Sequence, residues 1–544
     1  TGAVSSDWAI AGNWTAGVPG SWNLISIPSS QNDPLLSGSL TIGSTASLTI
    51  EAGGALTVTG DLSNNGPVTI GSTLLSSGSL IVNGTVTGDI TYNRQLKTGT
   101  VAGSDFHLVA PPVASNAEAN TGKISSVNQW AELTGIWSTT NITSALPGHG
   151  YNIRQEDASD GMISFTGPLV NTDVTVSASS PYADAIGPDD SYFDRTFSAD
   201  RSLTNLGGNG WNLLGNPYPS AISASAFIDA NYSATPSLSQ FDPNYVALYL
   251  FDGTARRYYY LANSTGWPSG LDLSGTHVQA GQGFFVLAMN DNSEFMFTRT
   301  MQEHSTGTAM LKSGSADNRW PGLQLKMQCE NGEVFTTVVY GESMSTGVDP
   351  GYDIGLFRSG QGIDLYTKLA LRDNGVFYTR QALPSAWADT IVVPVGVDYE
   401  KGGDVVFSAV TAPVGNRRFW LEDRAKGIFT ELGLKSYSVS LPANTLGTGR
   451  FYLVASSNTP TQALSTEGQS GLQIWAASGK VVVRGMVYEG AVCEIIALNG
   501  GTIAEVQLSG GQLNTVDLPS DIHGIYIVRI IDRSGVTTRK VLIP

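Results

Sequence analysis

Cysteine and charge are both scarce in this 544-residue sequence. The two cysteines, Cys329 and Cys493, lie far apart, so a disulfide scaffold is excluded for most of the chain. Each occurs within an apolar, strand-like pattern, which favours buried free thiols. Charged residues make up 14% of the sequence, well below the share of about a quarter that is usual in globular proteins.

The sequence also has too few basic residues for a nucleic-acid partner and no apolar run long enough for a transmembrane helix. The 29 Lys and Arg residues face 46 Asp and Glu, for a net charge of −17. Nucleic-acid binding needs clustered basic side chains, so we expect no such partner. No apolar run reaches the roughly 18 residues of a transmembrane helix. The start at Thr1 has no charged segment followed by an apolar one, as expected after removal of a signal peptide.

Signatures of catalysis and metal binding are missing as well. The sequence has no nucleophile elbow of the Gly-x-Ser-x-Gly type and no phosphate-binding loop of the Walker type. The histidines occur singly, without the spacing of zinc ligands; they are His107, His149, His277, His304 and His523. We therefore expect a protein that is not an enzyme and has no catalytic residues.

Glycine is abundant, with 63 residues, and Ser, Thr and Asn accompany it. This composition suits short strands joined by tight turns better than it suits helices. The length allows several domains. We predict a multidomain all-β protein with an N-terminal β-solenoid-like repeat at 1–95, two β-sandwich-like domains at 96–312 and 313–460, and a linker followed by an Ig-like sandwich at 461–544.

An apolar repeat dominates the first 95 residues. Residues 40–42, 48–50 and 56–58 each place Thr between two aliphatic residues, and they recur every eight positions with Gly turns between them. Short apolar strands at constant spacing are typical of a β-solenoid. The ends of such a stack need caps. We expect the following domain to cap one end and the segment around Trp8 and Trp14, which resembles the start of many large Bacteroidetes surface proteins, to cap the other.

The middle of the chain carries two further resemblances. The sequence GWNLLGNPYP at 210–219, followed by GQGFFV at 281–286, is similar to a module of many secreted Bacteroidetes proteins that carries no established activity. A helix is predicted at 223–230 within it. Residues 313–460 contain strands at sandwich spacing and resemble the domain that often precedes a sorting domain in such proteins.

The end of the chain carries the most specific motif. A Gly-x-Tyr-x-Val element at 524–528 precedes a terminal Arg-Lys-Val-Leu-Ile strand at 539–543. This pair resembles the type A C-terminal sorting domain of Bacteroidetes type IX secretion cargo, although Ile522-His523 and Pro544 depart from the usual pattern. The resemblance implies recognition by the type IX outer-membrane machinery and a secreted or cell-surface location. It implies a sorting signal formed by Gly524, Tyr526, Val528, Arg539, Lys540, Val541 and Ile543.

Two other groups of residues are candidate sites. Asp190, Asp194, Asp349 and Asp353 lie in acidic loops of the kind that bind Ca²⁺, with a solvated turn as the alternative. No other cofactor is expected. Three aromatic residues are candidates for stacking on glycans, with core packing as the alternative; they are Tyr258, Tyr259 and Trp267.

These observations predict a non-enzymatic, exported cell-surface protein with an adhesive or structural role. Exposed strand edges would allow it to assemble with copies of itself into an extracellular layer or filament. The alternative is a surface protein that binds or hydrolyses carbohydrate, for which surface glycans would be the partner. A peptidase is a third alternative.

Overall fold

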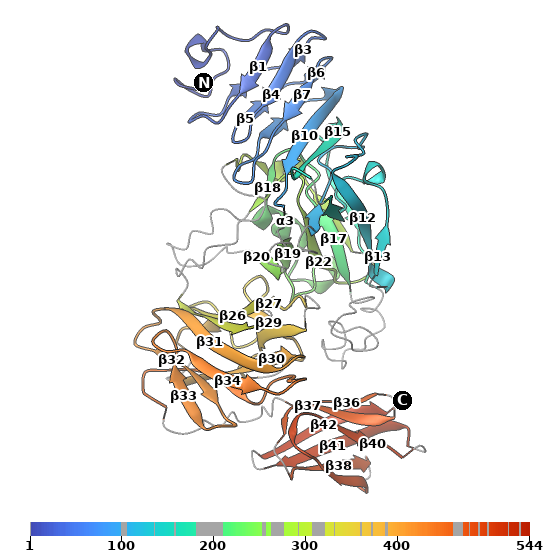
Figure 1. Ribbon diagram of the computed structural model, residues 1–544, viewed down its shortest axis with the longest axis vertical. Helices are drawn as coiled ribbons and strands as arrows, with labels where there is room; N and C mark the ends of the chain where they lie inside the picture. Colours follow the sequence, from blue (N-terminus) through green and yellow to red (C-terminus); the bar gives the residue numbers. More distant parts are fainter. Residues whose placement is uncertain are drawn as a thin grey trace. The chain divides into compact units, whose positions relative to one another are not determined.

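The computed structural model is nearly all β, which confirms the predicted multidomain all-β class (Figure 1). Its chain forms two compact units, unit 1 up to residue 306 and unit 2 from residue 321, which are described separately. Among the described residues, no helix is long and apolar enough to cross a membrane. The structure describes residues 2–98, 106–134, 136–156, 159–180, 210–252, 257–262, 277–291, 293–306, 321–330, 332–358, 362–371, 374–386, 390–460, 472–477, 479–487, 490–497, 500–519, 522–532 and 535–543.

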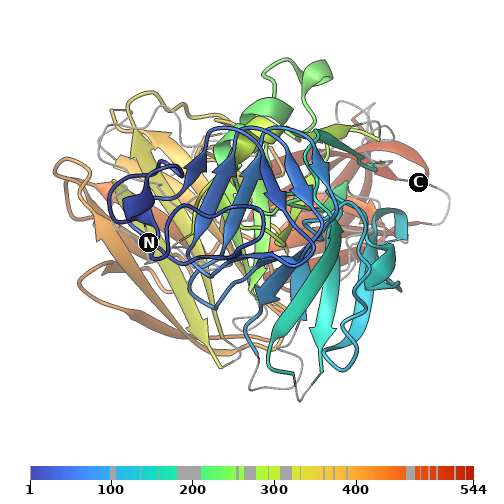
Figure 2. The ribbon, with the colours of Figure 1, turned by 90° about the horizontal axis from the view of Figure 1, so that it is seen from above.

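Unit 1 begins with a three-sided β-solenoid whose strands pair in parallel (Figure 2). One side consists of β1 (Leu24–Ile27), β4 (Ser47–Ile50), β7 (Val68–Ile70) and β10 (Asp89–Gln95). The second consists of β2 (Leu35–Leu36), β5 (Ala55–Val58) and β8 (Ser79–Val82). The third consists of β3 (Leu40–Ile42), β6 (Leu62–Asn64) and β9 (Val86–Thr87).

The eight-residue repeat corresponds to one side of this solenoid, not to a full coil. The repeats at 40–42, 48–50 and 56–58 form β3, β4 and β5, which belong to three different sides. A full coil returns after 22 residues where Leu40 of β3 pairs with Leu62 of β6. The aliphatic residues of each triplet point inward and the central Thr points away from the core, so the repeat period reports the side length.

Both ends of the solenoid are capped, as the sequence predicts. At the first end the Trp8 backbone N–H donates to the Leu35 carbonyl oxygen at 3.1 Å, and the Leu35 N–H donates to Ser6 at 2.7 Å. A 3₁₀ turn, η1 (Ala11–Asn13), leads to Trp14, whose indole N–H donates to Trp8. At the other end β15 (Met162–Pro168) pairs antiparallel with β10 along its full length. A strand from the next region therefore closes the stack.

The described residues in the rest of unit 1 form four small sheets. The first has the order β11 (Phe106–Val109), β14 (Tyr151–Gln155), β12 (Ile124–Ala131) and β13 (Ile136–Thr139). The second has the order β17 (Trp211–Gly215), β22 (Gly283–Leu287), β19 (Ala247–Asp252) and β20 (Arg257–Ala262). The others are the pair β16 (Val174–Ser177) and β23 (Glu294–Phe297), and the set β21 (His277–Val278), β18 (Ala221–Ser223) and β24 (Gln302–Glu303). Further 3₁₀ turns are η2 (Glu132–Thr134), η3 (Ile142–Ser144), η4 (Pro236–Leu238) and η5 (Arg299–Met301).

The predicted helix is present as α3 (Ala224–Asn231). Ser223 caps it, because its hydroxyl oxygen accepts from the Ala226 N–H at 3.3 Å. Phe227 and Ile228 face a core that includes Phe284 of β22 and Phe295 and Phe297 of β23.

His304 joins the loop after β24 to the solenoid. Its ring nitrogens lie 2.8 Å from the Thr57 hydroxyl and 2.7 Å from the Ser79 hydroxyl. Burial lowers the pKa of this ring from 6.5 to about 4. The folded state therefore holds the ring neutral at a pH at which the unfolded chain is already protonated.

We expect unit 1 to lose stability as the pH falls from about 6.5 to about 4. In that interval the unfolded state binds one more proton at His304 than the folded state does, so acid favours unfolding. Urea unfolding followed by tryptophan fluorescence at several pH values measures the effect. The His304→Gln variant keeps polar contacts but cannot titrate, so its stability should depend less on pH. Equal pH dependence in the two proteins would contradict the assignment.

Unit 2 begins with one long sheet that folds back on itself. Leu325, Val393, Phe407 and Phe451 share a single core, and the Phe407 and Phe451 rings lie 5.0 Å apart. The sheet thus supplies both layers of a sandwich. Its order is β33 (Ile428–Glu431), β32 (Arg418–Asp423), β35 (Phe451–Ser456), β30 (Thr390–Tyr399), β28 (Ile363–Thr367), β29 (Tyr378–Pro384), β26 (Gly332–Gly341), β25 (Gly322–Cys329), β31 (Gly403–Ala412) and β34 (Tyr437–Leu441), with β27 (Ile354–Gly355) also on β29.

The described residues at the end of unit 2 form a separate sandwich of seven strands. One sheet has the order β36 (Gln473–Ala477), β37 (Lys480–Val487) and β40 (Gly511–Asp517). The other has the order β39 (Thr502–Gln507), β38 (Val492–Ala497), β41 (Gly524–Asp532) and β42 (Gly535–Ile543). Both sheets contribute to one core, for example through Val483 and Val528. We call residues 472–543 the C-terminal sandwich.

The cysteines differ in burial. Cys493 is buried in the core of the C-terminal sandwich, and burial raises the pKa of its thiol to about 11. Cys329 ends β25 and is only half-buried, so the expectation of a buried thiol is wrong for this residue. Its position at a strand end explains the difference. Both thiols are free.

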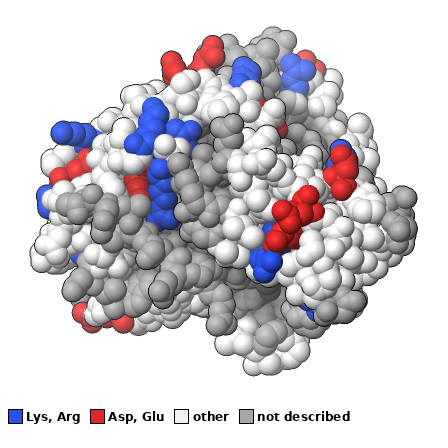
Figure 3. Space-filling view, turned by 90° about the horizontal axis from the view of Figure 1, so that it is seen from below, with Lys and Arg blue, Asp and Glu red and all other residues white. Residues whose placement is uncertain are grey.

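Charged side chains are thinly spread on the face drawn in Figure 3. There, Lys and Arg occur in small groups next to Asp and Glu, and most of the described surface is uncharged (Figure 3). This distribution follows from the low charge content of the sequence.

Candidate functional site

The predicted sorting residues meet in one hairpin, formed by β41 and β42. Gly524 pairs with Ile543, Tyr526 pairs with Val541, and Val528 lies opposite Arg539. The two motif elements, which are separated in sequence, therefore occupy the same end of the hairpin. The structure brings every member of the predicted set together.

The two faces of this hairpin differ. Val541 and Ile543 point into the sandwich, whereas Lys540 and Leu542 are exposed, as the alternation of a strand requires. Arg539 is also exposed, next to Lys540. The motif thus combines core positions that build the hairpin with basic and apolar positions that face solvent.

The strand β42 lies at the edge of its sheet. In the part of the chain that the structure describes, β42 pairs with β41 and with no second strand. An edge strand offers a row of backbone N–H and C=O groups to an added strand. Leu542, 67% exposed, and Lys540 stand on this edge and would contact such a partner.

Gly524 begins β41 with a φ of +106°, a conformation that favours glycine. A Cβ at this position would meet no atom within 4 Å, so backbone conformation, not space, explains the glycine. Ile522 and His523, which depart from the usual motif, precede the strand without breaking it. Pro544 lies outside the described residues.

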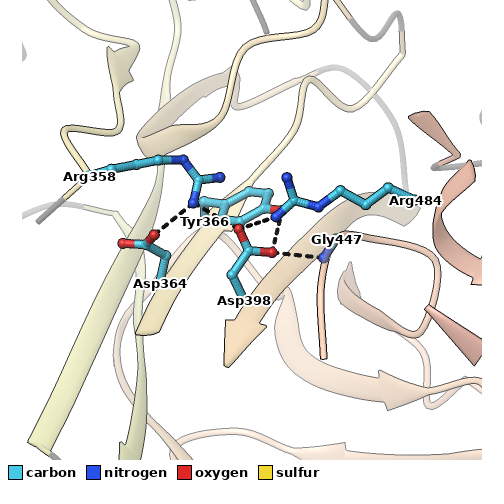
Figure 4. A network of polar contacts seen from close by, with 6 residues as sticks. All are labelled: Arg358, Asp364, Tyr366, Asp398, Gly447 and Arg484. Carbon is cyan, nitrogen blue, oxygen red and sulfur yellow. Dashed lines mark hydrogen bonds and ion pairs between the residues drawn. The ribbon is translucent and has the colours of Figure 1, made fainter. Parts of the chain in front are cut away.

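A buried ionic network elsewhere in unit 2 was not anticipated from the sequence (Figure 4). Asp398, fully buried on β30, accepts from the guanidinium groups of Arg358 at 2.8 Å and Arg484 at 2.5 Å. The Gly447 backbone N–H donates to it at 2.8 Å and the Tyr366 hydroxyl at 3.2 Å. Four groups from different segments thus surround one carboxylate.

Burial and the neighbouring guanidinium groups shift the pKa values of the carboxylates in this network in opposite directions. Burial acts to raise the pKa of Asp398, but Arg484 and Arg358 together outweigh burial and lower that pKa below its usual value. Asp364, 2.7 Å from Arg358, has a pKa raised to about 7 because burial outweighs the nearby guanidinium. Both guanidinium groups also lie over the ring of Phe377, which adds cation–π attraction.

Two of the calcium candidates are also brought together, but their oxygens bind backbone groups. Asp353 accepts from the N–H of Asp349 at 2.6 Å and from that of Ala382 at 2.7 Å, and Asp349 accepts from the N–H of Ser345. Burial raises the pKa of Asp353 to about 8. These contacts order the loop before β27, and calcium binding there stays a prediction.

The structure gives no more support to the other candidates for a metal. Asp190 and Asp194 lie outside the described residues. Within the described ranges, no three His, Cys, Asp or Glu side chains are grouped in a way that could hold a metal ion.

Tyr258 of β20, a candidate for glycan stacking, is part of an aromatic cluster with rings of β19 and β22. Its ring lies 5.0 Å from that of Phe251 and 6.1 Å from that of Phe285, and burial raises the pKa of its hydroxyl. These contacts favour core packing for Tyr258. Tyr259 is half-buried on the same strand, and Trp267 lies outside the described residues.

The same cluster includes an exposed tryptophan that sequence reasoning did not single out. Trp137 on β13 stacks edge-on against Trp130 at 5.2 Å and against Phe285 at 6.1 Å, and it is 37% exposed. Burial does not alternate along β13, because every residue of this strand is exposed. The sequence pattern therefore did not single out Trp137. A role of this cluster in glycan binding stays a prediction.

Comparisons with known proteins give one family. No curated protein matches the chain. Among solved structures, Ruminococcus gnavus Beta-glucuronidase aligns with 27% of this chain over 36% of its own length, at 12% identity and a TM-score of 0.09, which is too low to relate the two folds. Residues 1–454 match the family described as "Domain of unknown function (DUF8693)", which contains the solenoid, the second region of unit 1 and the first sandwich of unit 2. The chain therefore belongs to the DUF8693 family.

Proposed function

We propose that this is a non-enzymatic, exported cell-surface protein whose C-terminal sandwich is the signal for type IX secretion. The observation that carries the proposal is the register of the β41–β42 hairpin, which pairs both halves of the sorting motif at one edge of the sandwich. A core of its own supports the hairpin. The sandwich therefore suits an independent recognition unit.

Recognition would use the exposed side of β42. Arg539 and Lys540 offer positive charge, and Leu542 offers apolar surface beside a strand that, in the described residues, pairs only with β41 and lies close to β36 of the other sheet. Strand addition to such an edge supplies affinity through backbone hydrogen bonds, and side chains supply specificity. The secretion machinery would thus bind the strand and its basic residues together.

An adhesive or structural role for unit 1 is the second part of the proposal. The solenoid is capped at both ends, which prevents uncontrolled stacking of its coils. In contrast, β13 lies at a sheet edge and exposes all four of its residues, Ile136 and Trp137 among them. This edge is the place where unit 1 would meet another copy or a surface ligand.

Charge reversal at Arg539 and Lys540 tests the secretion signal. The Arg539→Glu/Lys540→Glu variant should fold, because both side chains are exposed, yet it should stay in the cell. The measurement compares cell-bound, surface-exposed and released protein by immunoblot after expression in a Bacteroidetes host with an active type IX system.

Lys480→Glu is the matched control. Lys480 is also exposed in the C-terminal sandwich, on β37 and beside Asp517 at 3.0 Å, but it lies outside the hairpin. Its export should equal that of the unaltered protein. Equal export from a host without the type IX machinery, or unchanged export of the double variant, would overturn the proposal.

A further inference from the structure

Arg484 links the two sandwiches of unit 2. It lies on β37 of the C-terminal sandwich, and its partner Asp398 lies on β30 of the preceding one. Arg484 is 4% exposed and Asp398 is fully buried, so the pair is removed from solvent at the junction. This environment differs from that of an exposed ion pair, which contributes little to binding.

Two glycines at the same junction give an independent sign of close packing. A Cβ on Gly447 would lie 3.2 Å from the backbone of Gly485 and 3.3 Å from Cγ of Arg484. Gly447 and Gly485 adopt φ angles of +95° and +117°, which favour glycine. The Gly447 loop therefore approaches β37 backbone to backbone, and the Gly447 N–H also donates to Asp398.

The preceding sandwich provides a prepared site for the Arg484 side chain. Asp398 is already held by Arg358 and Tyr366, and the Phe377 ring lies 5.8 Å from the Arg484 guanidinium. Such preorganisation lowers the ordering cost of binding. A buried charge pair is also screened little by salt.

We infer that the C-terminal sandwich is docked on the preceding sandwich through Arg484, Asp398 and the Gly447–Gly485 contact, and that it stays bound when the linker between them is cut. We call this set of contacts the latch. It joins the DUF8693 region, which ends at residue 454, to a domain outside that region.

Cleavage of the linker in the full chain tests the latch. A protease recognition sequence replaces residues 461–471, whose composition indicates a linker. After cleavage the two fragments should co-elute in size-exclusion chromatography, even at about 1 M salt, where the Debye length is about 3 Å. Arg484→Ala should raise the dissociation constant at least about 30-fold, so that the fragments separate.

Arg529→Ala is the matched control. Arg529 is bound to Glu494 within the C-terminal sandwich, so its loss should leave co-elution intact. Circular dichroism of the released fragment shows whether Arg484→Ala has unfolded it instead of undocking it. Separation of the unaltered fragments, or co-elution of the Arg484→Ala fragments as strong as that of the unaltered protein, would overturn the inference.

Discussion

Replacing Asp398 with alanine is expected to destabilise unit 2 by about 3–5 kcal/mol. The substitution leaves the guanidinium groups of Arg358 and Arg484 buried without the carboxylate that both contact. It also removes the acceptor for the Gly447 N–H and the Tyr366 hydroxyl. Chemical denaturation followed by fluorescence and circular dichroism would show a lower midpoint for unit 2.

A second carboxylate of the same sandwich provides the control. Asp404 is exposed on β31, so Asp404→Ala should change the stability by less than about 0.5 kcal/mol. Asp398→Asn keeps the shape and one acceptor but loses the charge, and its cost should fall between the two. If Asp398→Ala proved as mild as Asp404→Ala, the network would be dispensable for folding.

The latch and the stability of unit 2 are separable through these variants. Asp398 belongs to the preceding sandwich, where its loss also disturbs Arg358, whereas Arg484 belongs to the C-terminal sandwich. Arg484→Ala should therefore weaken docking more than it weakens folding. Comparing the two substitutions assigns the cost of the network to folding or to docking.

The solenoid shows which features of a fold a local sequence pattern can predict and which it cannot. Its strands and its inward residues follow from short triplets such as residues 48–50, because alternation within a strand is a local property. The coil period does not follow, since the spacing of eight residues is compatible with several stacking geometries. The three parallel sheets, in which for example Leu40 pairs with Leu62, establish three sides per coil.

The β41–β42 hairpin and the buried ionic network also differ in how much of each the sequence predicts. The predicted sorting residues lie on two strands that follow one another in the chain, so the sequence motif identified both strands, and the structure then showed that Tyr526 pairs with Val541. The network brings together Arg358, Asp398 and Arg484 from distant segments. One local signal was available, since Asp398 interrupts an apolar strand whose residues are buried on both faces. Such a carboxylate needs a buried partner, but its identity depends on long-range packing.

The boundary near residue 95 is the part of the fold that local patterns describe least well. The core around the solenoid continues without a break into residues such as Val109, Tyr151 and Phe165. The cause is β15, which returns to pair with β10 after the 66 residues of intervening chain at 96–161. The solenoid and the first part of the next region therefore share one core and should unfold together.

Phe165→Ala tests this shared core and should destabilise unit 1 by about 3–5 kcal/mol. Phe165 of β15 lies opposite Tyr92 of β10, and both side chains are fully buried. Truncation leaves a cavity at the point where the last solenoid strand is covered. Urea unfolding gives the cost, and hydrogen exchange should show lower protection of the β10 amides.

Thr166→Ala is the matched control on the same strand. Thr166 points away from the core and shares a hydrogen bond of 3.0 Å with the Thr91 hydroxyl, so its loss should cost about 1 kcal/mol. The two variants change the same β10–β15 pair, one through the core and one through its outer face. A larger cost for Phe165→Ala, with loss of protection that spreads from β10 into β7, means that β15 stabilises the coils by covering their open end. If the two variants lost the same free energy of unfolding, the solenoid would be stable without this cap. It would then be an independent domain.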